Sequence, residues 1–122
     1  MKQELSYYER CFIEMKEMFN LPDEIFLELN DAFFDIAFQQ VELLRIALLQ
    51  KDMEQLILHS HTLKGSSLSL RHISISRIAA EIENHAKDKT FFAYATAIYT
   101  LSEEISKIRS LYMNWKAYQS DQ

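Results

Sequence analysis

The sequence predicts an all-α protein, an antiparallel up-down four-helix bundle with a short extra N-terminal helix. One Gly and one Pro in 122 residues leave little material for hairpin turns. Apolar residues recur at helical spacing along almost the whole chain. The connections between these periodic segments are about two to four residues long, and such short connections make consecutive helices antiparallel neighbours.

The first two helices are predicted from residues 4–19 and from a longer segment that follows Asn20. The first carries the apolar residues Leu5, Tyr8, Phe12, Met15 and Phe19. The second begins with Pro22 in its first turn, and Asp23 and Glu24 complement the positive end of the helix dipole. It runs for about 27 residues, or about 40 Å. Its predicted apolar stripe consists of Ile25, Leu29, Phe33, Ile36, Gln40, Leu44 and Leu48, with Phe26, Ala37 and Val41 beside them.

Three further helices complete the predicted bundle. Asp52 is expected to be the N-cap of a helix over 53–70, whose inward seam is Leu56, Ser60, Leu63, Ser67 and Leu70. After Arg71 and His72, the helix over 73–88 has Ile75, Ile78, Ala79, Ile82 and Ala86 in phase. Thr90 is expected to cap the last helix, whose stripe is Phe91, Tyr94, Ala95, Ile98, Leu101, Ile105, Ile108, Tyr112 and Trp115.

Length, charge and cysteine content narrow the class of protein. We expect residues 1–122 to form a single domain. A net charge of −5 with scattered basic residues disfavours nucleic acid as a partner. Cys11 is the only cysteine, which fits a reducing cytoplasm, and no targeting or membrane-spanning segment is recognisable. The polar outer faces of the helices favour a monomer.

The stretch "HSHTLKGSSLSL", residues 59–70, contains the only glycine, inside a predicted helix. His61 lies beside the inward seam and is expected to point outward, with Lys64 and Gly65 one turn further along. An exposed imidazole is a nucleophile near neutral pH because much of it is uncharged. The Lys64 ammonium would favour that neutral form and attract an incoming phosphoryl group.

The face around His61 also offers room and contacts for a second protein. Gly65 removes any side chain that would hinder a partner from closing over His61, although close packing against another helix would also explain a glycine. Ile57 and Leu68 supply apolar contacts of the kind found in docking patches. A nucleophilic histidine, a cation and an open approach together indicate a phosphoryl acceptor.

These residues resemble the signature of histidine-containing phosphotransfer (HPt) domains, which is His-x-x-Lys-Gly followed by two small residues. Asp52 before the helix, the small Ser60 before His61, and Ile82–Glu83 on the next helix match the same family. The resemblance covers about residues 20 to 118. One position departs from the pattern: where family members commonly have Gly ten residues after the histidine, this chain has Arg71.

The resemblance implies a phosphocarrier of a two-component phosphorelay with no catalytic activity of its own. His61 would accept a phosphoryl group from the aspartyl phosphate of a receiver domain, and Lys64 and Gly65 would assist phosphate binding and docking. The expected partners are receiver domains of response regulators and of a hybrid sensor histidine kinase. The Mg²⁺ would belong to the receiver, so no cofactor is expected on this chain. Arg71 would either let the helix run on or add charge near the docking surface.

The same residues have other interpretations. His59 and His61 point away from each other on a helix, and no spacing typical of metal ligands gathers His59, His61, His72 and His85. Ser66 and Ser67 lack the surroundings of a hydrolase nucleophile. The alternative function is a helical interaction module that binds a kinase or regulator without being phosphorylated. Met1 and the polar end "AYQSDQ" favour an independent protein over a piece of a hybrid kinase.

Overall fold

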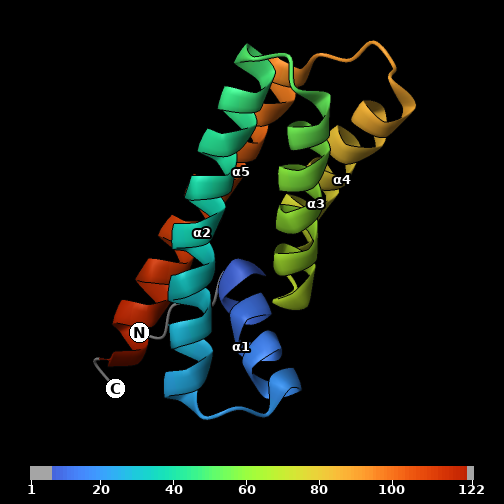
Figure 1. Cartoon of the computed structure of the whole chain (residues 1–122). Helices are drawn as coiled ribbons and strands as arrows, with labels where there is room; N and C mark the ends of the chain where they lie inside the picture. Colours follow the sequence, from blue (N-terminus) through green and yellow to red (C-terminus); the bar gives the residue numbers. More distant parts are fainter. Residues whose placement is uncertain (1–6, 121–122) are drawn as a thin grey trace.

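The computed structural model describes residues 7–120, and these form five helices (Figure 1). They are α1 (Tyr7–Phe19), α2 (Asp23–Leu49), α3 (Met53–Ser69), α4 (Ile73–Asp88) and α5 (Tyr94–Ser120). The predicted all-α class is confirmed, and the described residues contain no strand. Within 7–120, none of the helices combines the length and the apolar character that a membrane span requires.

The four longer helices pack in a closed ring of contacts. α3 lies between α2 and α4, and α5 packs against both α2 and α4. α1 packs against α5 and occupies the half of the molecule where α3 ends and α4 begins (Figure 1). The α3–α4 pair has the most extensive contact in the fold. It is this pair that fixes the position of His61 relative to α4.

The predicted core positions of α3, α4 and α5 are largely confirmed, except that Ala95 is exposed and Ile78 is only partly buried. Leu56, Ser60, Leu63 and Ser67 of α3 are buried, while Leu70 lies just beyond the helix and is partly exposed. In α4 and α5 the buried apolar residues are Ile75, Ala79, Ile82, Ala86, Ile98, Leu101, Ile105, Ile108, Tyr112 and Trp115. Phe12 of α1 joins this core and packs on Tyr112 and Trp115, with ring centroids 5.6 and 5.7 Å away. Leu5 and the Tyr8 side chain, predicted to belong to the same stripe, lie outside the described part of the chain.

The stripe predicted for α2 is wrong at one edge. Ile25, Leu29 and Ile36 are 42%, 43% and 45% exposed, whereas Phe34 and the polar Asn30 are buried. The apolar residues of α2 cover a wider arc than its neighbours can bury, so periodicity alone could not show which edge faces the core. The exposed edge leaves an apolar surface on α2.

The helix ends follow the predicted boundaries closely. Asp52 is the N-cap of α3, and its side chain accepts a hydrogen bond from the Gln55 N–H at 3.1 Å. Pro22 is the N-cap residue of α2 rather than a residue of its first turn. Arg71 has a left-handed backbone with φ of 63°, so α3 stops at Ser69 and does not run on through Arg71. This is the backbone conformation that glycine adopts most easily, which explains why a glycine would suit the same position.

The connection into α5 differs from the prediction. α5 begins at Tyr94, so Thr90 does not cap it, and Phe91 is fully exposed instead of joining the stripe. The Thr90 hydroxyl lies 2.7 Å from Nδ1 of His85, at the end of α4. Phe92 stacks on the His85 ring at a centroid distance of 4.0 Å. Thr90 and Phe92 therefore close the end of α4 rather than the start of α5.

A buried polar pair connects the start of α4 with α2. The His72 ring is 2% exposed and stacks on Phe33 at a centroid distance of 4.7 Å. Its Nε2 lies 2.8 Å from Oδ1 of Asn30, and the Asn30 amide donates to the carbonyl of Phe26 at 3.0 Å. Because the Asn30 oxygen can only accept, His72 Nε2 carries the proton. Burial lowers the pKa of His72 to about 4, so the ring is neutral near pH 7.

Candidate functional site

The middle of α3 presents His61 to solvent because the residues around it are held in the core. Ser60 and Ser67 are buried, and each hydroxyl donates to a backbone carbonyl of its own helix, Leu56 or Leu63, at 2.6 Å. These small, internally satisfied side chains allow neighbouring helices to approach α3 closely. His61 lies next to this seam, and 62% of its side chain is exposed.

Glu83 of α4 is the hydrogen-bonding partner of His61. Its carboxylate oxygen Oε2 lies 2.8 Å from Nδ1 of the imidazole, and the Glu83 side chain has no exposed area. Contact between α3 and α4 brings these residues together across 22 positions of sequence. The site is therefore assembled from two helices.

Two lysines complete a charged cluster around Glu83. The Lys64 ammonium lies 2.7 Å from Oε1, and the Lys87 ammonium lies 2.7 Å from Oε2. Burial by itself raises the pKa of Glu83. The hydrogen bonds from Lys64, Lys87 and His61 outweigh this effect and lower the pKa to about 2. Glu83 is thus a carboxylate at any physiological pH.

The carboxylate determines the tautomer of a neutral His61. An ionised carboxylate only accepts hydrogen bonds, so the Nδ1 that faces it carries the proton. The lone pair of the imidazole is then on Nε2, the ring nitrogen for which the described residues offer no hydrogen-bond partner. His61 therefore has a nucleophilic nitrogen and a protonated nitrogen with separate surroundings.

Gly65 leaves the surface beside His61 open. A Cβ built at this glycine would meet no atom within 4 Å outside its own helix backbone. Close packing against another helix therefore does not explain the glycine. Ser69, one turn further along, donates its hydroxyl to the Gly65 carbonyl at 2.9 Å.

An apolar groove of about 510 Å³ begins next to Gly65, between α3 and α2. Ser66, Ser69 and Leu70 line it from α3, and the exposed edge of α2 contributes Leu29, Ala32, Phe33 and Ile36, with Phe19 at the end of α1. The exposed Leu68 lies on the same stretch of α3. An exposed apolar surface of this kind is typical of a protein-binding site.

The other residues predicted for the site occupy different places. Ile57 is partly buried and packs against the core, so it offers only part of its side chain to a partner. Arg71 lies at the turn after α3 and lines a separate pocket near α1. His59 contacts Gln40 of α2 and Gln55, at 3.1 and 3.0 Å, on the side of α3 away from Glu83.

In the sequence, Glu83 is recognisable only as a match to the family pattern, and Lys87 was not predicted to belong to the site. The spacing of Glu83 and Lys87, one helical turn apart, could have indicated an ion pair on α4. That Glu83, with Lys87 bound to it, reaches His61 depends on the register between α3 and α4. Within the described part of the chain, no three His, Cys, Asp or Glu side chains come together in a way that could hold a metal ion.

The site therefore consists of an exposed histidine held by a carboxylate on the next helix, with two lysines bound to that carboxylate, and it presents a nucleophilic ring nitrogen to solvent. The chain belongs to the Hpt domain family, whose model matches residues 28–111. The resemblance seen in the sequence is thereby confirmed. Hpt domains are phosphocarrier modules of two-component phosphorelays.

One solved structure supports the fold. The crystal structure of histidine-containing phosphotransfer protein B (HptB) from Pseudomonas aeruginosa PAO1 is similar, with a TM-score of 0.74 and 21% identity over 93% of each chain. A search of curated proteins found no match.

Proposed function

We propose that this protein is a phosphocarrier in which His61 accepts a phosphoryl group from the aspartyl phosphate of a receiver domain and passes it to another receiver. The observation that supports this most is the 2.8 Å contact between Glu83 and Nδ1, because it leaves the Nε2 lone pair free. The receivers would belong to response regulators and to a hybrid sensor histidine kinase, in the cytoplasm. The up-down bundle expected for this family is compatible with the ring of contacts among α2, α3, α4 and α5.

The proposed transfer uses the two imidazole nitrogens differently. The Nε2 lone pair attacks phosphorus and a P–N bond forms. The P–O bond to the receiver's aspartate breaks, and its electron pair leaves with the aspartate carboxylate. The ring then carries a positive charge, and Glu83 stabilises this charge through the proton that stays on Nδ1. Transfer to the next receiver reverses these steps.

Lys64 is proposed to assist the phosphoryl group. Its ammonium contacts Glu83 at 2.7 Å, yet 32% of its side chain is exposed, so it has room to turn towards a phosphoryl group on Nε2. Lys87 would continue to neutralise Glu83 when Lys64 turns away. The Mg²⁺ and the catalytic carboxylates would come from the receiver, and this chain would supply no catalysis beyond a well-presented nucleophile.

The receiver is proposed to dock over Gly65 and along the groove between α2 and α3. Gly65 would allow the partner's phosphorylated aspartate to approach His61 closely. The exposed Leu29, Ile36 and Leu68 would supply apolar contact area. Ile57 would contribute at the margin of this surface, and the protein is expected to act as a monomer.

Phosphoryl transfer in solution tests the proposal. Receiver domains are phosphorylated with labelled acetyl phosphate and Mg²⁺, freed of donor, and mixed with this protein. We expect label that is lost in acid and stable in alkali, absent from His61→Ala and retained by the matched variant His59→Ala. Binding of a receiver without transfer, unchanged in His61→Ala, would instead indicate an interaction module that is not phosphorylated.

A further inference from the structure

Glu83 is paired with more positive charge than a single carboxylate balances. Its side chain has no exposed area, and the ammonium groups of Lys64 and Lys87 each lie 2.7 Å from one of its oxygens. Burying a carboxylate is costly unless a cation pairs with it, but one lysine already balances one negative charge. The second lysine therefore needs an explanation beyond the burial of Glu83.

The two lysines reach Glu83 from different helices. Lys87 follows Glu83 by one turn of α4, in the order Glu then Lys that favours such pairs, and it contacts Oε2. Lys64 comes from α3, where it lies one turn beyond His61, and it contacts Oε1. Because the lysines hold different oxygens, one of them can leave the carboxylate while the other stays.

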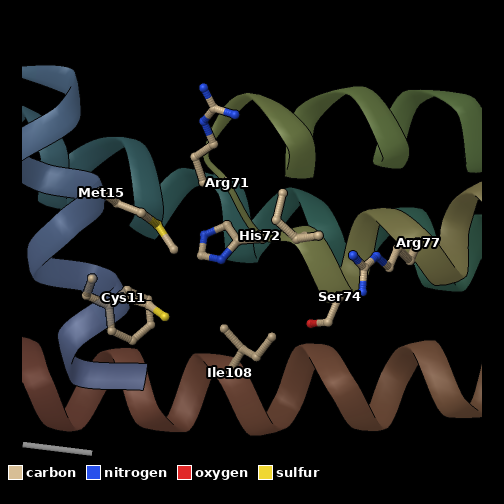
Figure 2. Close-up of a pocket in the computed structure, with 9 residues that line it drawn as sticks. Cys11, Met15, Arg71, His72, Ser74, Arg77 and Ile108 are labelled. Atoms are coloured by element: carbon tan, nitrogen blue, oxygen red, sulfur yellow. The ribbon is translucent and has the colours of Figure 1, made fainter. Parts of the chain in front are cut away.

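The arginines at the start of α4 lie apart from this cluster. Arg71 and Arg77 line a pocket between α1, the start of α4 and α5 (Figure 2). Among the described residues, neither arginine forms an ion pair with Glu83, whereas Lys64 and Lys87 both do. The charge of Glu83 therefore depends on the two lysines.

Only Lys64 is placed to meet a phosphoryl group on His61. Lys87 contacts Oε2, the same oxygen that lies 2.8 Å from Nδ1 of His61, so it is on the side of the ring away from Nε2. In the proposed transfer the ring becomes positive only as the P–N bond forms. When Lys64 turns towards the incoming phosphoryl group the ring is still neutral, and Lys87 is then the cation that stays on the buried carboxylate.

From this arrangement, and resting on the proposed function, we infer that Lys87 is a positioning residue that sets the rate of phosphoryl transfer by releasing Lys64 from Glu83. Without Lys87, the departure of Lys64 would leave a carboxylate with no exposed area unbalanced, so Lys64 would stay on it. The same exchange occurs in reverse when the P–N bond breaks. Lys87 therefore affects acceptance and release alike and leaves the equilibrium between them unchanged.

Single-turnover transfer from a labelled, phosphorylated receiver domain, and back to it, tests this inference. The receiver is saturating and the pH is 8.5, about two units above the ordinary pKa of histidine. We expect Lys87→Met to slow transfer in both directions about tenfold, with less than about a twofold change in the equilibrium constant and in receiver affinity.

Two further variants separate the charge of Lys87 from a structural effect. Lys87→Arg keeps a cation that can reach the carboxylate, and it should restore the rate to within about threefold of the wild type. Lys89→Met removes an exposed lysine two positions further along and should leave the rate unchanged. Thermal unfolding of each variant verifies the fold, which is expected to be intact because 52% of the Lys87 side chain is exposed.

A variant without the carboxylate shows whether Lys87 acts through Glu83. Glu83→Gln leaves no negative charge to retain Lys64, so adding Lys87→Met to it should change the rate less than about twofold. If Lys87 attracted the phosphoryl group directly, the loss of about tenfold would persist in this background. Such persistence, or equal rates for the wild type and Lys87→Met, would overturn the role of Lys87 and leave the phosphocarrier proposal standing.

Phosphoramidate, a small phosphoryl donor, makes the inference testable without a receiver. The Nε2 lone pair of His61 attacks its phosphorus, and the P–N bond of the reagent breaks as its electron pair leaves with ammonia. Labelling by phosphoramidate but by no receiver would overturn the proposed relay function, while a loss of about tenfold in Lys87→Met would still support the role of Lys87. Absence of label from both donors would overturn both proposals.

Discussion

The buried His72 makes the stability of this protein depend on pH in a window that can be calculated. The pKa of His72 is lowered by burial from 6.5 to about 4, so below pH 6.5 the unfolded chain binds a proton that the folded protein does not. The contribution of the uncharged His72 to the free energy of unfolding is complete above pH 6.5 and is lost as the pH falls towards 4. Between pH 7 and pH 5 this linkage amounts to a loss of about 2 kcal/mol in the free energy of unfolding.

The measurement is urea unfolding at pH 7 and pH 5 for the wild type and two variants. His72→Gln keeps an amide that can donate to Asn30 but does not titrate, and His85→Gln removes a histidine of the same helix that lies outside the core. The contribution of Glu83 does not interfere, because it is lost only as the pH falls from about 4.5 towards about 2.

Between pH 7 and pH 5 we expect the free energy of unfolding to fall by about 2 kcal/mol in the wild type and in His85→Gln. In His72→Gln the fall should be smaller by about 2 kcal/mol, because the titrating ring is absent. His72→Gln should be less stable at both pH values because it loses the stacking on Phe33. If His72→Gln keeps the full loss between pH 7 and pH 5, the reasoning about His72 is refuted.

Four further substitutions, at three positions, test the helix and the site. Gly65→Ala should stabilise the protein by about 0.5–1 kcal/mol in urea unfolding, since its Cβ meets open space. Gly65→Trp should keep its circular dichroism spectrum while phosphoryl transfer falls about 100-fold, and unfolding would show the glycine to be structural. Arg71→Gly should stabilise by about 0.5–1 kcal/mol by relieving the left-handed backbone, whereas Arg71→Ala should not. Glu83→Gln should slow acceptance of the phosphoryl group about 10- to 100-fold, and the exposed Glu81→Gln should not.

The fold could be predicted where apolar residues occupy a narrow arc of each helix. α3 and α4 have one such arc each, and their buried seams agree with the sequence except at Leu70 and Ile78, which are partly exposed. α2 is apolar over a wide arc, so Ile36 was predicted inside although it is exposed. Asn30 is buried because it meets His72, a partner 42 positions away that no local pattern reveals.

The site could be predicted as far as it lies on one helix. The spacing within α3 placed His61 outward with Lys64 and Gly65 near it, and the structure has them so. The hydrogen bond from His61 to Glu83 depends on how α3 packs against α4, which spacing within one helix does not specify. The loop before α5 was mispredicted because Thr90 satisfies the end of α4 instead of the start of α5.

The position of the phosphoryl group on the imidazole tests the central claim most directly. The protein is phosphorylated by a receiver domain, and NMR of the His61 ring identifies which nitrogen carries phosphorus. Because Glu83 holds the proton on Nδ1, we predict phosphorus on Nε2 of His61. Phosphorus on Nδ1, or on a residue other than His61, would contradict the account.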